Sequence, residues 1–367
     1  MKVIQILPNL ALGGAEIMVE TLSSALRDLG IEVTVVSLYS EVTAISKRLE
    51  KAGIPVIFLN KKPGFDWMLV TRLFKIFWTE KPDVVHSHLY ATTYVVPAAL
   101  LARVKVIVHT IHSMADKEVG SLKRRIYKLF YKWLNVKPIA ISSRVQKSFW
   151  DVYRLDDLEV PVIANGIDLG KCKRKVYIED ASSAVQVLHI GSFKKAKNHI
   201  GLIDSFRIVH EKNPNIVLNL IGAGHLEEMT RKRVEQLGLV EHVVFWGSKD
   251  DVFSYLEEAD IFVLPSLWEG MPISLIEAMG TGVAIVATNV GGIPDMLENE
   301  VTALLVDVDE FEIADAILRL AENFELRERL GSNARSRSAN FSAETMAMSY
   351  LKVYNESLEE KFSARRK

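Results

Sequence analysis

The chain has 367 residues, of which 49% are hydrophobic and 25% are charged. This composition is typical of a soluble globular enzyme, and the length suggests two or three domains. The single cysteine, Cys172, excludes an internal disulfide and fits a reducing compartment. We expect neither a secretory signal nor a transmembrane helix, because no run of about 20 consecutive apolar residues occurs.

Charge is distributed unevenly along the chain. Residues 1–168 contain 22 Lys+Arg and 16 Asp+Glu, whereas the remainder contains 23 and 30. A basic half beside an acidic half suggests that one face of the protein meets something anionic. Nucleic acid is not the expected partner, because the sequence has no long basic run with interleaved aromatic residues and no known nucleic-acid-binding module.

In the first half, apolar runs alternate with helical patterns. Residues 3–7 read as a strand, the pair Gly13-Gly14 as a loop and residues 17–29 as a helix. Further strands are predicted at 33–38, 56–59, 83–88, 104–110, 138–142 and 160–164, and helices at 43–51, 67–78, 91–101, 122–134 and 145–153. Such alternation predicts a parallel sheet, which binds ligands at the carboxyl ends of its strands. Four histidines fall near such ends: His86, His88, His109 and His112.

A turn signal at 165–168 and a polar, basic stretch from residue 171 predict a domain boundary after residue 168. A second alternation follows. Its strands are predicted at 185–190, 216–221, 243–246, 261–266, 284–288 and 303–306, and its helices at 200–210, 226–237, 251–257, 273–279, 311–322, 326–337 and 343–359. The sequence therefore predicts an α/β protein with two doubly wound domains, 1–168 and 169–342, facing each other across a cleft.

Residues 269–280 are the most informative segment. They combine a short Gly/Pro loop after a buried strand with the N-terminus of a helix, whose unpaired N–H groups and dipole suit a phosphate. Glu269 and Glu277 flank that spot, and a carboxylate accepts hydrogen bonds well from a vicinal diol. A nucleotide sugar carries both groups. Two plainer readings stay open: Ser274 and Glu277 fit a capping box, and Glu269 fits a solvated loop charge.

Two further motifs have an ordinary reading beside a functional one. Lys194, Lys195 and Lys197 follow a predicted strand and suit a diphosphate, but they also fit a solvated charge run. Asp307 and Asp309 match the D-x-D pattern of metal-dependent sugar transferases, but Asp309 precedes a helix and is better placed as its N-cap. We therefore expect no metal site and no cofactor.

Residues 117–137 are rich in lysine and arginine and contain one acidic residue, Glu118. Within them Ile126, Leu129, Phe130 and Trp133 recur at helical spacing and share one helix face. A basic amphipathic helix can lie on an anionic membrane surface. The alternative is a surface helix that packs this apolar face on the sheet.

The chain resembles the GT-B retaining glycosyltransferases of family 4 along nearly its whole length. The specific match is the E-x7-E stretch within residues 265–280, from Glu269 to Glu277. It is accompanied by Gly13-Gly14-Ala-Glu16, Asn165-Gly-Ile-Asp168, residues 191–197 and Gly291-Gly-Ile-Pro-Asp295. In the family, the last helix, here within 343–360, often crosses back onto the N-terminal domain.

The resemblance implies roles for individual residues. Glu277 would bind the donor ribose, and Glu269 with the amides of Gly270 and Met271 would hold the donor sugar. Lys197 would stabilise charge on the leaving diphosphate. The remaining assignments are Leu275 and Gly14 with Gly13 at the phosphates, His112 near the sugar and acceptor, and His88 on the acceptor side. Ser192 stands where the family usually has an arginine, and Lys194 or Lys195 would supply the missing charge.

The expected function is metal-independent, retaining transfer of a hexosyl or N-acetylhexosaminyl group (EC 2.4 class). The donor is a nucleoside diphosphate sugar, based on UDP or GDP, and the acceptor a hydroxyl of a lipid-linked or polysaccharide precursor. The expected location is cytoplasmic, peripheral on the inner membrane face. Two alternatives remain: a GT-B nucleotide-sugar epimerase, and a non-catalytic nucleotide-sugar-binding subunit. An NAD(P) enzyme is disfavoured, because no G-x-G-x-x-G is followed by an acidic residue about 20 positions on.

Overall fold

The computed structural model describes residues 1–178 and 183–366 and contains two compact units. Unit 1 comprises Met1–Gly166 and Ala343–Lys367, and unit 2 comprises Ile167–Ser342. The first boundary lies close to the expected one at residue 168. Part of the polar stretch that follows it, residues 179–182, lies outside the described residues.

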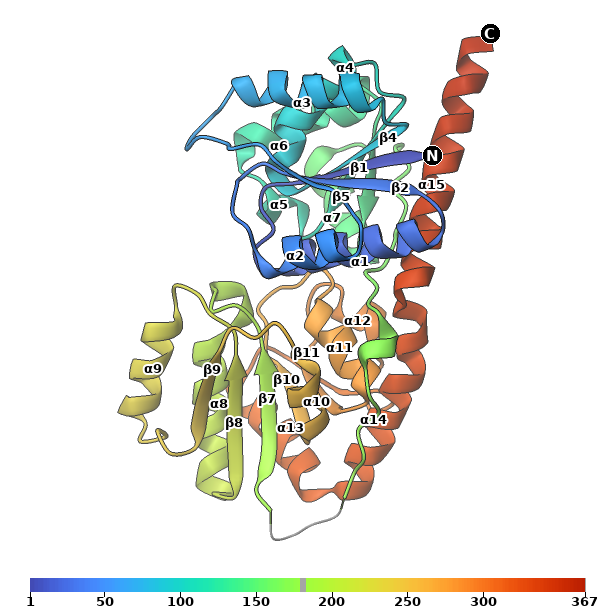
Figure 1. The fold of residues 1–367 in the computed structure, drawn as a ribbon. Helices are drawn as coiled ribbons and strands as arrows, with labels where there is room; N and C mark the ends of the chain where they lie inside the picture. The colour runs from blue at the N-terminus through green and yellow to red at the C-terminus, as the bar shows by residue number, and fades with distance from the viewer. Residues whose placement is uncertain (179–182, 367) are drawn as a thin grey trace. The chain divides into compact units, whose positions relative to one another are not determined.

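Unit 1 is built around a six-stranded parallel sheet with helices on both faces (Figure 1). Its strands run in the order β3-β2-β1-β4-β5-β6. Their bounds are β1 (Lys2–Leu7), β2 (Glu32–Ser37), β3 (Val56–Phe58), β4 (Val84–His88), β5 (Val106–Ile111) and β6 (Val136–Ala140). The helices are α1 (Gly14–Asp28), α2 (Ala44–Lys51), α3 (Met68–Glu80), the 3-10 turn η1 (Leu89–Ala91), α4 (Thr92–Leu101), α5 (Ala115–Glu118), α6 (Ser121–Trp133), α7 (Ser143–Tyr153) and α15 (Ala343–Arg366).

Unit 2 repeats this plan with the strand order β9-β8-β7-β10-β11-β12. Its strands are β7 (Val185–Ile190), β8 (Ile216–Ile221), β9 (Val243–Gly247), β10 (Ile261–Leu264), β11 (Ala284–Thr288) and β12 (Leu304–Val306). Its helices and 3-10 turns are η2 (Leu169–Lys171), η3 (Lys195–Lys197), α8 (His199–Lys212), α9 (Glu227–Gln236), α10 (Phe253–Glu258), α11 (Ile273–Thr281), α12 (Ile293–Met296), α13 (Glu310–Glu322), α14 (Phe324–Ser338) and η4 (Ala339–Phe341).

The central strands are buried along their length because helices cover both faces of each sheet. Every residue of β4, β5 and β11 is buried. Both sheets reverse their strand order at one point, between β1 and β4 in unit 1 and between β7 and β10 in unit 2, where Ile6 pairs with Ser87 and Ile261 with Val187. In doubly wound sheets, ligands bind at the carboxyl ends of the strands beside this reversal.

The sequence predictions of the elements are confirmed with one exception. The strand expected at 160–164 is wrong: the structure has only an isolated bridge, between Ala140 and Val162. The C-terminal helix α15 belongs to unit 1, where it lies against α1 and β5. Its Tyr350 and Tyr354 are fully buried.

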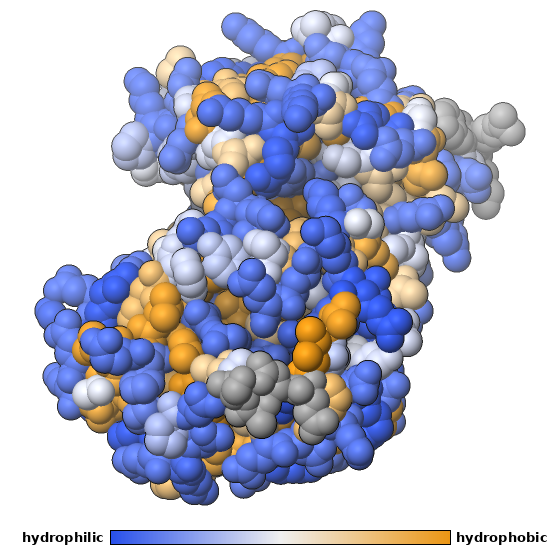
Figure 2. Space-filling model, turned by 60° about the horizontal axis from the view of Figure 1, so that its bottom comes forward, coloured by the Kyte–Doolittle hydropathy of each residue, from blue (hydrophilic) through white to orange (hydrophobic). Residues whose placement is uncertain are grey.

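The surface of the chain is mixed. Figure 2 shows a face on which hydrophilic residues predominate and apolar residues form separate groups. Among the described residues, no helix is both long enough and apolar enough to cross a membrane.

Candidate active site

The strand-order reversal of unit 2 carries an ion pair. Lys197, in the turn after β7, donates from Nζ to Oε1 of Glu269, in the loop after β10, over 2.6 Å. The Ser266 hydroxyl donates to the same oxygen, also over 2.6 Å. Both charged side chains are mostly buried, so solvent screens the pair weakly. The readings of Glu269 as a solvated loop charge and of Lys197 as part of a solvated run are therefore wrong.

The two loops that supply this pair are joined by hydrogen bonds. The Leu267 N–H donates to the Ala196 carbonyl over 2.8 Å, and the Asn198 side-chain amide donates to the Pro265 carbonyl over 3.1 Å. The stem of Lys197 passes over Gly191, where a Cβ would lie 3.2 Å from its Cγ and Cδ. The position of Lys197 is thus determined by backbone contacts as well as by its ion pair.

A third loop, which contains Gly291, packs closely against the backbone of Glu269 because it has a glycine at the point of contact. Gly291 has φ of +55°, and a Cβ there would lie 1.9 Å from the Glu269 carbonyl oxygen. Gly222, with φ of +142°, approaches the Gly191 carbonyl in the same way. The backbone on which Glu269, Gly270 and Met271 stand is therefore held by close packing that no larger residue would permit.

Helix α11 begins earlier than the capping-box reading requires. Its N-cap is Pro272, without a side-chain cap, so the interpretation of Ser274 as N-cap is wrong. The N–H of Leu275 donates to the Pro272 carbonyl over 3.2 Å. The first-turn groups that a helix leaves open are therefore the N–H groups of Ile273 and Ser274, and these are better placed for a phosphate than that of Leu275.

Glu277 lies one turn into α11 and is half-buried. Burial raises the pKa of its carboxyl to about 7, while nearby Lys171 partly opposes the shift. No residue that the structure describes forms a hydrogen bond or ion pair with this carboxylate. A half-buried carboxylate with open acceptor sites suits the hydroxyl pair of a ribose.

Ser192 and Lys194 lie in the turn between β7 and η3, where the Lys194 N–H donates to the Ser192 carbonyl over 2.7 Å. Lys194 and Lys195 are exposed. The structure therefore places Ser192 at the carboxyl end of β7 with two exposed lysines in the same turn. That one of them replaces the charge of the family arginine stays a prediction.

In unit 1, His88 and His112 form a pair at the carboxyl ends of β4 and β5. His88 Nδ1 lies 2.9 Å from His112 Nε2, and His88 Nε2 lies 2.8 Å from Gln5 Oε1. Since Gln5 Oε1 can only accept, His88 carries its proton on Nε2 and accepts from His112 at Nδ1. Burial lowers the pKa of His112 to about 3, so both rings are neutral at physiological pH.

The other two histidines at these strand ends hold the core together. His86 bonds to Tyr354 of α15 over 2.7 Å and to Thr110 over 2.8 Å, and His109 bonds to Tyr131 over 2.6 Å. Glu118 is buried beneath His112, whose backbone N–H donates to it over 3.4 Å, and burial raises the pKa of Glu118 to about 8.

Gly13 and Gly14 lie where α1 begins, with Gly13 as the N-cap. A Cβ at Gly13 would lie 2.5 Å from Oε2 of Glu16, so Glu16 folds back over the start of the helix. The backbone of Gly14 is therefore exposed at this end of the sheet, whereas the Glu16 carboxylate covers Gly13.

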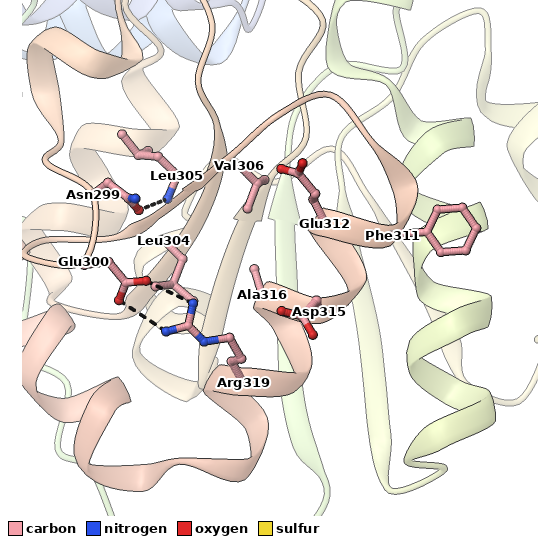
Figure 3. Close-up of a pocket in the computed structure, with 10 residues that line it drawn as sticks. All are labelled: Asn299, Glu300, Leu304, Leu305, Val306, Phe311, Glu312, Asp315, Ala316 and Arg319. Carbon is pink, nitrogen blue, oxygen red and sulfur yellow. Dashed lines mark hydrogen bonds and ion pairs between the residues drawn. The ribbon is translucent and has the colours of Figure 1, made fainter.

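Asp309 caps α13, accepting from the N–H groups of Phe311 and Glu312, as expected. Within residues 1–178 and 183–366, no group of three or more His, Cys, Asp or Glu could hold a metal ion. A surface pocket of about 440 Å³ lies beside β12 and α13 (Figure 3). An ion pair between Glu300 and Arg319 occupies part of its wall, and none of the predicted site residues lines it.

Sequence reasoning missed Gln5 and Ser266. Gln5 is a fully buried polar residue that interrupts the apolar run of strand β1, and that interruption was a usable signal. Ser266 stands three residues before Glu269, a spacing that favours a local side-chain contact.

Comparisons with known proteins agree with this architecture. The family model described as Glycosyltransferase Family 4 matches residues 12–171, and that described as Glycosyl transferases group 1 matches residues 179–337. The chain is 28% identical over 309 residues to UDP-Gal:alpha-D-GlcNAc-diphosphoundecaprenol alpha-1,3-galactosyltransferase of Escherichia coli, covering 78% of each chain. It is 25% identical to N-acetyl-alpha-D-glucosaminyl L-malate synthase of Bacillus anthracis, covering 80% of this chain and 79% of the relative.

Among solved structures, Anabaena Alr3699/HepE in complex with UDP-glucose superposes with a TM-score of 0.85 at 21% identity, covering 97% of this chain and 100% of that chain. The fold and the two family models together define a two-domain α/β sugar-transferring enzyme. The chain belongs to the GT-B glycosyltransferases, in the family 4, group 1 branch.

Proposed function

We propose that the protein is a retaining, metal-independent glycosyltransferase. It moves a sugar from a nucleoside diphosphate to a hydroxyl of a lipid-linked or polysaccharide precursor. The observation that carries this proposal is the Lys197–Glu269 ion pair beside the open first turn of α11. It combines a cation for a phosphate, a carboxylate for sugar hydroxyls and backbone N–H groups in one place.

Each group has a defined task in this reaction. The diphosphate lies at the N-terminus of α11, Glu277 accepts from the ribose hydroxyls, and Glu269 with the Gly270 and Met271 amides orients the sugar. As the bond from the anomeric carbon to the diphosphate breaks, Lys197 stabilises the negative charge that develops on the leaving oxygen. The acceptor oxygen bonds to the anomeric carbon on the same face, and its proton passes to the departing phosphate.

Unit 1 supplies the acceptor side through neutral His112. His88 is fully buried and uses both ring nitrogens, so it orients the His112 ring and does not touch the acceptor. Because His112 donates from Nε2 to His88, its Nδ1 is left to accept from a sugar or acceptor hydroxyl without placing a charge there. Metal independence is supported by the use of Asp309 as a helix cap and by the cations at the phosphate site. UDP sugars are the first donors to test, because the E. coli relative is named as using UDP-Gal. GDP sugars are the second.

We also propose a peripheral site of action on the inner membrane face. In α6, Phe130 is buried, but Leu122, Leu129 and Trp133 are exposed. The apolar face predicted for this helix is therefore divided, and only part of it packs on the protein. The exposed part is accompanied by five basic residues and no acidic one within Ser121–Trp133, which suits an anionic bilayer.

The test is calorimetric binding and thermal shift across nucleoside diphosphates and their sugars, with and without EDTA. Stabilisation by UDP or GDP that survives EDTA is expected. Failure of every nucleotide to stabilise the protein would contradict the donor site. The two alternatives are separated by turnover: an epimerase converts the donor without an acceptor, and a non-catalytic subunit binds it without hydrolysis or transfer.

A further inference from the structure

The loop between β3 and α3, residues 60–67, exposes its two aromatic side chains and buries two of its three charged ones. Phe65 and Trp67 are 73% and 67% exposed, whereas Lys61 and Asp66 are 8% and 6% exposed. The usual preference is the reverse, because apolar side chains gain from leaving water and charges lose. Such an arrangement needs a structural cause and a partner that compensates for the exposed apolar surface.

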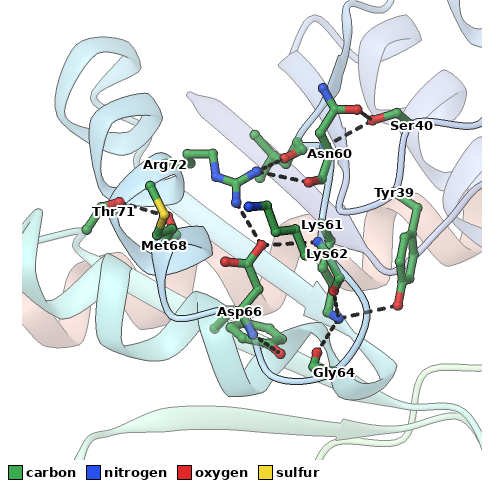
Figure 4. Close-up of polar contacts among 12 residues, drawn as sticks. Tyr39, Ser40, Asn60, Lys61, Lys62, Gly64, Asp66, Met68, Thr71 and Arg72 are labelled. Carbon is green, nitrogen blue, oxygen red and sulfur yellow. Dashed lines mark hydrogen bonds and ion pairs between the residues drawn. The ribbon is translucent and has the colours of Figure 1, made fainter.

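The cause is the bonding of Lys61 inside the loop (Figure 4). Its Nζ donates to the carbonyl oxygens of Lys62, over 2.9 Å, and Gly64, over 2.6 Å, and to the hydroxyl of Tyr39, over 3.3 Å. It also lies over the Tyr39 ring, 5.1 Å from its centroid. All three N–H groups of the ammonium are used, so Lys61 stabilises the conformation of the loop from within.

Asp66 closes the other end of the loop. Its Oδ2 accepts from the Lys62 N–H over 3.2 Å and from Arg72 over 2.7 Å, and Arg72 also donates to the Asn60 carbonyl over 3.1 Å. Phe65 rests one ring face on Tyr94, with centroids 5.4 Å apart. The loop is therefore ordered before any partner arrives, which reduces the entropy cost of binding through its aromatic side chains.

This loop adjoins the basic helix α6. Lys123 of α6 lies over the ring of Tyr90, 4.9 Å from its centroid, and the Tyr90 hydroxyl interacts with that of Tyr39, which bonds to Lys61. The loop follows β3 and Tyr90 follows β4, so both lie at the carboxyl edge of the sheet, the edge that carries His88.

We propose that residues 62–68 are a second contact with an anionic lipid bilayer, beside that of α6. Phe65 and Trp67 enter the boundary between headgroups and acyl chains, where aromatic rings are favoured, and Lys62 meets the headgroup phosphates. The inference rests on the proposed membrane association and adds a defined orientation to it. The carboxyl edge of the sheet then faces the bilayer, so a lipid-linked acceptor reaches this edge without leaving the membrane.

The test is co-sedimentation of the full chain with vesicles of phosphatidylcholine alone and of phosphatidylcholine with phosphatidylglycerol. The Phe65→Ser/Trp67→Ser double variant is expected to bind the anionic vesicles about tenfold more weakly or worse, since two large apolar side chains are lost from the contact. Phe311→Ser, on α13 of unit 2 and 63% exposed, is the matched control and should bind as the unsubstituted chain does. Lys62→Glu should weaken binding to the anionic vesicles only.

Three results would overturn the inference, and none depends on turnover. If the double variant keeps its affinity while Leu129→Ser/Trp133→Ser loses it, α6 alone contacts the bilayer. If the unsubstituted chain does not bind, both membrane proposals fail and the donor site is unaffected. If the double variant instead converts a dimer to a monomer without vesicles, this face is a self-association surface. Thermal unfolding of each variant checks that the fold is retained.

Discussion

Lys197 Nζ and Glu269 Oε1 lie 2.6 Å apart, although their residues are 72 positions apart in the chain. Each side chain neutralises the other until a donor arrives. A diphosphate that enters the site can then take over the lysine while sugar hydroxyls take over the carboxylate. The pair therefore keeps two binding groups in position at low electrostatic cost.

Lys197→Ala should lower kcat by about 100-fold or more, because charge on the leaving diphosphate loses its nearest cation. Lys195→Ala, an exposed lysine of the same turn, should change kcat little. Steady-state kinetics with calorimetric donor binding would separate turnover from affinity. Equal effects of the two substitutions would show that the turn acts only through its overall charge.

Donor affinity should rise with pH through about 7, the raised pKa of Glu277, because only the ionised carboxylate accepts from both ribose hydroxyls. If the protonated form does not bind, Kd at pH 6 should be about tenfold higher than at pH 8. The same shift makes folding stability fall as pH rises from 4.5 to about 7, since the folded state holds its proton more tightly. Calorimetry at a series of pH values checks this, and Glu277→Gln should bind weakly without the pH dependence.

Gly291→Ala should reduce activity and destabilise unit 2 by about 1–3 kcal/mol, because the added Cβ collides with the Glu269 carbonyl and φ is positive. Gly238→Ala is the control: φ there is +70°, but nothing lies within 4 Å of the added Cβ. Comparing thermal unfolding and kcat of the two separates backbone strain from displacement of Glu269. Similar activity losses in both would argue against the close-packing explanation.

His88→Leu should lower kcat about tenfold with donor affinity unchanged, because His112 loses the acceptor that orients its ring. His88→Asn, whose amide oxygen can occupy the place of Nδ1, should recover most of the activity. Nitrogen NMR of the unsubstituted protein is expected to show the His112 proton on Nε2 and both rings neutral from pH 5 to 8. A proton on His112 Nδ1 would contradict the arrangement with Gln5.

Much of this protein is readable from local pattern. The alternation of apolar runs and helical periods predicted both sheets, because parallel strands buried on two faces are rich in apolar residues. The segment 269–280 determined the donor loop, since a strand, a Gly/Pro turn and a helix start leave N–H groups open wherever they occur. The N-cap of that helix could not be predicted from local sequence, because Pro272 and Ser274 are both acceptable N-cap positions. In the folded protein the N-cap is Pro272.

Tertiary structure alone decided which side chains meet. Gln5 reaches His88 across 83 residues, and Lys197 reaches Glu269 across 72, through strands that become neighbours only when each sheet assembles. In α6, helical spacing placed Phe130 with Leu129 and Trp133, but the neighbouring surface covers only Phe130. Periodicity specifies the direction in which a side chain points along its own helix. What lies in that direction depends on how distant segments pack.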